Sequence, residues 1–219
     1  MRVVEHKYYF SIEDVFLENI FVGFTKPNLS GKIPNDIEVI FSELNKTIKI
    51  AHLNQIHSSK INFIKEAGLY IGDGLFTGCK NLTLVVRTAD CLPVFFANSN
   101  KIGLVHMGWR GAVEGILNNL DYKLSNFKVI AGVGLRSCCY KVGEEFLNYK
   151  EISSYLINRE GNLYFDPINF LLDKLIKKGL KEKNFFDIGI CSFCFPAKFY
   201  SFRRDKTTFR TISFIMKSK

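Results

Sequence analysis

The sequence of 219 residues is 47% hydrophobic and 23% charged, which is typical of a soluble globular protein able to bury a sizeable core. It has no apolar stretch near the roughly 20 residues that a membrane helix needs, and its first residues carry charges where a secretory signal would be apolar. Six cysteines without an export signal predict free thiols rather than a disulfide framework. We therefore expect a cytoplasmic protein with no membrane partner.

The net charge of +9 raises the question of a nucleic-acid partner. The densest basic run, residues 174–184, places lysines at helical spacing, and no nucleic-acid-binding motif accompanies it. We interpret this run as a solvated helix face and expect no nucleic-acid partner. An anionic small-molecule substrate would use the same positive potential.

Short runs rich in β-branched residues or phenylalanine predict strands along the whole chain, many of them buried on both faces. The predicted strands are Lys7–Ile12, Ile20–Phe24, Ile48–Ala51, Lys60–Ile64, Leu82–Val86, Pro93–Ala97, Lys101–Val105, Lys128–Gly132, Phe186–Ile190 and Thr211–Met216.

Helical periodicity predicts helices between these strands. A short one is expected over Asp36–Leu44, and an apolar stripe predicts a longer one over Trp109–Leu124. A further helix is expected to begin near Val142. Asp166-Pro167, an N-cap followed by a first-turn proline, starts the last one, which ends at Gly179.

Strands and helices alternate without the regular rhythm of a doubly wound sheet, and no linker or repeat divides the chain. The expected fold is therefore α/β: a single-domain mixed-sheet α/β sandwich over residues 1–219, with helices packed outside.

Three metal-competent side chains stand at predicted strand ends. His57 and His106 each follow a strand, and Cys91 lies in the turn after a third. Such residues can meet at one rim of a sheet, and two histidines with one cysteine leave a zinc ion an open fourth position, as in catalytic sites. The alternative is a buried cysteine with two unrelated histidines. His52, within an alternating strand, is interpreted as a packed residue.

The remaining cysteines and two aspartates have simpler interpretations. Cys191 and Cys194 form a C-x-x-C, which suggests redox chemistry or structural zinc, but no second C-x-x-C or histidine pattern accompanies it. We interpret it as a packed loop and the vicinal pair 138–139 as local packing. Asp73 is a candidate acid/base, and Asp90 a turn residue that positions Cys91.

Six ordered segments resemble the laccase-domain family, whose members are named polyphenol oxidoreductases and were later treated as purine nucleoside phosphorylases; one bacterial branch is called the peptidoglycan editing factor. The segments are NQIHSSK, GDGLFT, RTADCLPVFF, VHMGWRGAVEGIL, CCYKVGEEF and CSFC followed by FYSFRRDKTTFR. The resemblance implies that His57, Cys91 and His106 bind one zinc ion.

Basic residues complete the predicted site. Arg110 lies in the first turn of the helix after His106, where exposed amides and a guanidinium would suit phosphate; a surface salt bridge is the alternative. The resemblance adds the C-terminal arginines, Arg203, Arg204 and Arg210, as phosphate-binding candidates.

The resemblance implies a zinc-dependent purine nucleoside phosphorylase, which would convert adenosine, inosine, guanosine or methylthioadenosine and phosphate to the base and ribose 1-phosphate. Adenosine deamination would be a side reaction, and Trp109 or one of the many phenylalanines could stack on the purine. The alternatives are a cysteine hydrolase with Cys91 as nucleophile and His106 as base, and a cell-wall editing factor. A copper oxidase is disfavoured because the chain has only four histidines, and Met107 would point away from His106.

Overall fold

The computed structural model describes residues 1–27, 29, 32–43 and 48–218 of the chain. Its strands are β1 (Arg2–Glu5), β2 (Tyr9–Glu13), β3 (Ile20–Thr25), β4 (Lys49–Asn54), β5 (Ile61–Phe63), β6 (Gly68–Ile71), β7 (Gly74–Thr77), β8 (Leu82–Thr88), β9 (Leu92–Ala97), β10 (Ile102–Met107), β11 (Lys128–Ala131), β12 (Lys141–Val142), β13 (Leu156–Arg159), β14 (Asn162–Phe165), β15 (Phe185–Asp187) and β16 (Thr211–Lys217). Its helices are α1 (Asn35–Glu43), α2 (Trp109–Val113), α3 (Pro167–Lys177) and α4 (Phe202–Asp205), with 3₁₀ helices at Glu144–Asn148, Ser153–Tyr155 and Glu182–Asn184.

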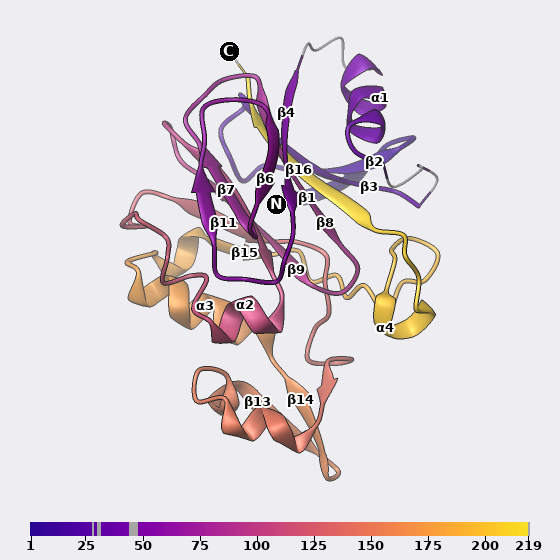
Figure 1. Cartoon of the computed structure of the whole chain (residues 1–219), viewed down its shortest axis with the longest axis vertical. Coiled ribbons are helices and arrows are strands. Elements are labelled where there is room, and N and C mark those ends of the chain that lie inside the picture. The colour runs from indigo at the N-terminus through magenta and orange to yellow at the C-terminus, as the bar shows by residue number, and fades with distance from the viewer. Residues whose placement is uncertain (28, 30–31, 44–47, 219) are drawn as a thin grey trace.

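Two large mixed sheets pack face to face (Figure 1). One has the order β1-β2-β3-β16-β8-β4-β6, and the other has the order β15-β11-β9-β10-β7-β5. Helix α1 covers the outer face of the first sheet, where Ile37, Ile40 and Phe41 pack at helical spacing against β16 and its neighbours. The segments of α2 and α3 cover the outer face of the second sheet. The layers confirm the predicted α/β sandwich with helices outside.

The second sheet is buried on both faces, which explains its continuous apolar strands. Along β10, Leu104 points between the two sheets, whereas Val105 and Met107 point toward the helices. Because side chains alternate along a strand, His106 lies on the side opposite Met107. This arrangement confirms the expectation that Met107 faces away from His106.

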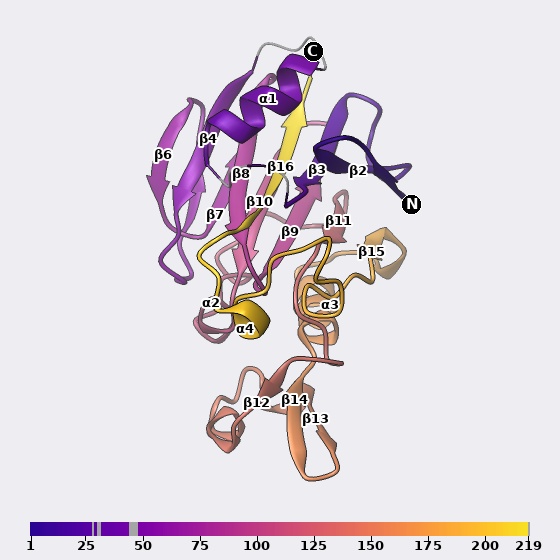
Figure 2. The same ribbon diagram turned by 90° about the vertical axis from the view of Figure 1, so that its right-hand side faces the viewer.

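A third sheet, β12-β14-β13, extends from one end of the body (Figure 2). The sequence analysis missed it and expected a helix to begin near Val142. That prediction is wrong: Val142 ends β12, and only a short 3₁₀ helix follows at Glu144–Asn148.

The predicted strands each correspond to an observed strand, with ends shifted by a few residues. Helix α3 begins where expected: the Asp166 side chain accepts hydrogen bonds from the Ile168 and Asn169 amides at 3.1 Å, and such a cap is worth about 1 kcal/mol. Gly179 has the left-handed conformation (φ +89°) that ends the segment. The end predicted for the first helix, residue 44, lies outside the described residues.

The helix predicted over Trp109–Leu124 is wrong in its length. Helix α2 ends at Val113, and Gly115 has φ +80°, which is incompatible with a continuing right-handed helix. The apolar residues beyond it are still buried against the second sheet. The apolar periodicity therefore predicted the burial of this segment correctly but its helical conformation wrongly. Among the described residues, no helix is long and apolar enough to cross a membrane.

Candidate functional site

The buried Asp73 carboxylate organises one end of the second sheet. It is 0% exposed and lies just before β7. Its Oδ1 accepts hydrogen bonds from the His57 amide at 3.1 Å and from His106 Nδ1 at 2.8 Å. Its Oδ2 accepts from the amide and the hydroxyl of Ser58 at 2.6 and 2.8 Å. One carboxylate thus fixes both histidines of the predicted ligand set.

These bonds support a local conformation that the chain would otherwise avoid. His57 has φ +58°, in the left-handed region that costs a non-glycine residue energy. His106 is 2% exposed, and its Nδ1 is engaged by Asp73. A histidine that donates from Nδ1 leaves Nε2 for a metal ion, and a carboxylate partner of this kind orients the ring. Asp73 is not among the residues that line the cavity and lies behind His106, a place that suits a positioning residue better than the expected acid/base.

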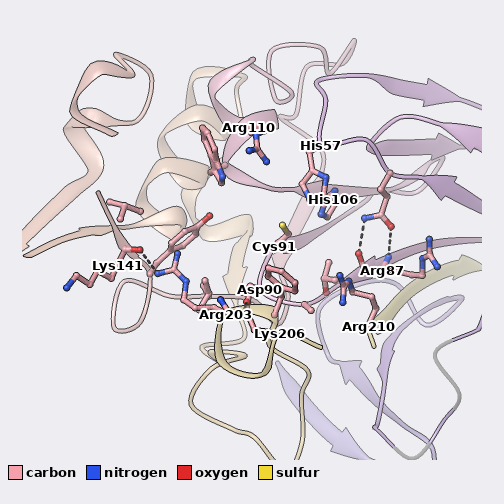
Figure 3. A pocket seen from close by; sticks show the side chains of 18 of the residues that line it. His57, Arg87, Asp90, Cys91, His106, Arg110, Lys141, Arg203, Lys206 and Arg210 are labelled. Atoms are coloured by element: carbon pink, nitrogen blue, oxygen red, sulfur yellow. Dashed lines mark hydrogen bonds between the residues drawn. The ribbon is translucent and has the colours of Figure 1, made fainter. Parts of the chain in front are cut away.

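The three predicted ligands converge from separate elements. His57 follows β4, Cys91 lies between β8 and β9, and His106 lies in β10. Their donor atoms all lie within 4.8 Å of one another, and the two imidazole rings meet edge to face with centroids 4.9 Å apart. Figure 3 shows the three side chains together at the wall of one cavity.

The electrostatics of the cluster favour a thiolate. Burial raises the pKa of the Cys91 thiol, but charge interactions and hydrogen bonds with His106 and His57 outweigh burial and lower it to about 6. Burial lowers the pKa of His106, but Cys91 and Asp73 together raise it to about 9. Without a metal ion, the cluster therefore holds a thiolate beside an imidazolium at neutral pH.

The donor set and the space beside it fit one metal ion. Two imidazoles and a thiolate are a ligand set typical of zinc and related ions. A Cβ added at Gly108 would lie 3.2 Å from both Cys91 Sγ and His57 Cδ2. The glycine thus keeps the space next to the ligands free.

A cavity of about 1210 Å³ opens in front of the three donors. Six cationic side chains line it, against two carboxylates, Asp90 and Glu145. The cationic residues are Arg87, Arg110, Lys141, Arg203, Lys206 and Arg210. The cavity is therefore suited to an anionic substrate.

The structure brings three of the four predicted arginines to the cavity. Arg110 lies over the Trp109 ring at 4.8 Å, and Arg203 and Arg210 come from the α4 region. Arg204 is not at the cavity: its guanidinium donates to the backbone carbonyls of Ser192, Phe193 and Phe199. The side chain of Arg204 thus binds a loop.

Asp90 connects Cys91 to the C-terminal arginines. It has φ +97°, and its carboxylate accepts from the Ser192 hydroxyl at 2.8 Å and from the Arg203 amide at 2.7 Å. The left-handed backbone and these contacts fit the interpretation of Asp90 as a turn residue, and its positioning of Cys91 stays a prediction. The same contacts place Arg203 at the cavity wall, where its guanidinium also donates to the Lys141 carbonyl.

Aromatic side chains form a second part of the wall. Trp109 and Phe146 line the cavity with ring centroids 5.0 Å apart, and Tyr149 packs behind them. Tyr140 also lines the cavity, and burial raises its pKa, so it stays protonated as a donor. Phe202 also lines the cavity, and Arg210 Cζ lies 5.8 Å from the centroid of its ring.

The sequence analysis missed several lining residues. Arg87 is held by reciprocal backbone bonds with the Gln55 side chain, both 2.8 Å. Lys141 reaches the cavity from β12. Lys206, the residue with left-handed backbone that ends α4, also lines it. Of these three residues, only Arg87 could have been suggested by the sequence, because it directly follows the predicted strand Leu82–Val86 and comes shortly before Cys91.

Comparisons with known proteins agree with this architecture. A family model described as "Multi-copper polyphenol oxidoreductase laccase" matches residues 23–218, so the chain belongs to this family. It is 30% identical to a Borreliella burgdorferi protein named purine nucleoside phosphorylase, over 93% of the chain and 94% of the relative. It is 31% identical to an Aquifex aeolicus protein of the same name, over 86% and 92%.

Solved structures share the fold. YlmD from Geobacillus stearothermophilus superposes with a TM-score of 0.88 at 20% identity, covering 99% of this chain and 98% of that one. The hypothetical protein YfiH from Bacillus licheniformis superposes with a TM-score of 0.85 at 21% identity, covering 98% of each chain.

The family's description mentions several copper ions, and the histidines here do not supply several sites. The chain has four histidines in all. His6 stacks on Tyr9 and bonds to Ser11, and His52 lies within β4. Among the described residues, His57 and His106 therefore share one histidine-containing cluster, which could hold one metal ion.

Proposed function

We propose that the chain is a purine nucleoside phosphorylase whose metal ion is zinc, held by His57, Cys91 and His106. The observation that carries the proposal is the position of these three donors at the wall of a cavity lined by six cationic side chains. Relatives named purine nucleoside phosphorylase, similar over most of their length, support the reaction.

The ligand set supports zinc at this position. Two histidines and one cysteine leave a fourth position open, as catalytic zinc sites do. A bound zinc ion supplies a Lewis acid and activates water near neutral pH. Asp73 keeps His106 in the tautomer that binds through Nε2, and Gly108 leaves the room that the ligands need.

Phosphorolysis needs a phosphate subsite beside the nucleoside. An oxygen of phosphate attacks C1′ of the ribose, the bond from C1′ to the purine nitrogen breaks, and the base leaves with a proton. Arg110, Arg203 and Arg210 would hold the phosphate by charge-assisted hydrogen bonds. They neutralise its charge, which favours the approach of the anion to the ribose.

The aromatic wall supports a purine. Trp109 and Phe146 offer flat surfaces on which a base can stack, with Arg110 beside them. The substrates would be adenosine, inosine, guanosine or methylthioadenosine. Adenosine deamination would be a side reaction that uses the same metal ion and no phosphate.

Product analysis tests the proposal. Zinc-loaded protein is incubated with each nucleoside, with and without phosphate, and the products are separated by chromatography. We expect adenine and ribose 1-phosphate from adenosine in amounts that depend on phosphate, and inosine that does not depend on it. Intact nucleosides in every incubation with fully metal-loaded, folded protein would contradict the proposal.

A cysteine hydrolase is the second candidate. The pKa of Cys91 is lowered to about 6 and the pKa of His106 is raised to about 9, so a thiolate nucleophile would stand beside a protonated imidazole. Metal removal separates the two. The phosphorylase loses activity on chelation and regains it with zinc, whereas a cysteine hydrolase acting on a peptidoglycan precursor would be more active without metal.

A further inference from the structure

Four cysteines gather at a second place, and none of them is among the residues that line the cavity. Cys138 and Cys139 follow β11, and Cys191 and Cys194 follow β15. Their four Sγ atoms all lie within 4.8 Å of one another. We propose that these cysteines bind a second zinc ion, which has a structural role.

The sulfur positions fit a single tetrahedral ion. With a Zn–S bond of about 2.3 Å, two thiolates on one tetrahedral zinc lie about 3.8 Å apart. Cys194 Sγ lies 3.9 Å from Cys138 Sγ and 3.4 Å from Cys139 Sγ. A disulfide would need about 2.05 Å. Both distances are close to the distance between two ligands on one ion, and neither is that of a disulfide.

The donors limit which metal ions can bind. Four thiolates in a tetrahedral arrangement are typical of zinc or iron. Four sulfur atoms that all lie within 4.8 Å of one another suit a single ion better than a multi-iron cluster, whose ligands are spread more widely. Four protein ligands also close the site, which is the pattern of structural rather than catalytic zinc.

The sheet topology explains why a vicinal pair and a C-x-x-C meet. Strands β11 and β15 are parallel neighbours, so the segments that follow them leave the sheet at the same edge. The pairing continues to a bridge between Gly134 and Cys191, and the Ser192 amide donates to the Gly134 carbonyl at 3.1 Å. The missing partner of the C-x-x-C is thus the vicinal pair, supplied by the neighbouring strand.

The surroundings suit a negatively charged site. Four thiolates and one zinc ion carry a net charge of −2. Arg204 donates to the carbonyls of Ser192 and Phe193 at 2.9 Å, and Arg159 donates to the Ser137 carbonyl at 3.2 Å. Two guanidinium groups are therefore bound to the loops that carry the cysteines. Arg204 is also ion-paired with Asp205 at 2.5 Å, so its part in the second site is to hold the loop.

The second site would stabilise the wall of the first. Tyr140 and Lys141, which follow Cys139 directly, line the cavity. Ser192, between Cys191 and Cys194, donates to Asp90, which also holds the Arg203 amide. A zinc ion bound by both cysteine segments would therefore hold two parts of the cavity wall in place, the part with Lys141 and the part with Arg203.

Metal analysis of purified protein tests the proposal independently of activity. Elemental mass spectrometry should find two zinc ions per chain in the natural protein and one in Cys91→Ala, which keeps all four cysteines of the second site. Cys138→Ser/Cys194→Ser should lose one ion. Cys79→Ser is the matched control, because Cys79 is a free thiol outside both clusters, and it should keep two.

Substituting Co²⁺ for zinc in Cys91→Ala protein probes the second site without mutating any of its four cysteines. Four thiolates around Co²⁺ should produce intense sulfur-to-cobalt charge-transfer absorption. A Cys91→Ala protein with four reduced thiols that binds no metal would overturn the proposal. A disulfide among these cysteines, found by peptide mass spectrometry in freshly purified protein, or iron in place of zinc, would overturn it as well.

Discussion

The two ends of the cavity are built differently. The metal-ligand end is anchored in buried structure: His106 lies in a fully buried strand, and the buried Asp73 carboxylate holds the His106 ring and the backbone amide of the exposed His57. Apart from Arg87 in β8, the residues of the cationic end come from loops and short elements, and Arg110, Lys141 and Lys206 are exposed. The difference predicts that the ligand end varies little, whereas the preference among anionic ligands can change with the loops.

Removal of a metal ligand should have the largest effect. Cys91→Ala should reduce phosphorolysis and deamination to background, because both are proposed to need the same ion. The thermal unfolding midpoint should stay close to that of the natural protein, since Cys91 is only partly buried beside the cavity. If the variant keeps either activity, the ligand end does not carry the chemistry.

Replacing Asp73, which holds the two histidine ligands but is not itself a ligand, should weaken zinc binding without removing a ligand. Asp73→Asn keeps the size of the side chain but loses the negative charge beside His106. Metal affinity should fall about 10–100-fold, measured by competition with a coloured chelator, and excess zinc should restore much of the activity. An unchanged zinc affinity would mean that Asp73 only supports the fold.

The affinity for zinc should depend on pH through the ionisation of Cys91 and His106. Zinc needs the Cys91 thiolate and a neutral His106. Their pKa values of about 6 and about 9 mean that binding releases the His106 proton between these pH values. The apparent affinity should therefore rise roughly tenfold per pH unit from pH 6 to 9 and level off above it. A flat affinity across this range would contradict the proposed ionisation of the pair.

Changes at the cationic end should be smaller and confined to phosphate. A charge-assisted hydrogen bond at the lower end of its usual range is worth about 1.5 kcal/mol, which corresponds to roughly tenfold, so Arg110→Ala or Arg210→Ala should raise the KM for phosphate roughly tenfold and leave zinc content unchanged. Arg204→Ala is the contrast, because its side chain binds the Ser192–Phe193 loop outside the cavity. Equal phosphate KM values in all three variants would rule out the assignment.

The ligand end was also the more predictable from sequence. His57, Cys91 and His106 each stand near the end of an apolar strand, so the pattern that marks the strands also places the side chains at one rim. The layers of the fold followed from the same pattern. Asp73 was identified as chemically relevant, but its position behind His106 depends on pairing between β7 and β10, which no local pattern encodes.

The cationic end and the second cysteine cluster could not be predicted in this way. Lys141 and Lys206 reach the cavity through a small sheet and a short helix that have little periodicity. Helix α2 ends early because Gly115 has a positive φ, which an apolar stripe does not reveal. The four cysteines are adjacent only because β11 and β15 are parallel neighbours. Each of these features depends on tertiary contacts.

X-ray absorption at the zinc edge tests the metal-ligand end most directly. The sample is Cys138→Ser/Cys194→Ser protein loaded with one zinc ion, so that the second cluster does not contribute. We predict one sulfur neighbour at about 2.3 Å and two imidazole nitrogens at about 2.0–2.1 Å, with an oxygen as the fourth neighbour. A shell without sulfur, or one with several sulfurs, would contradict a zinc ion held by His57, Cys91 and His106.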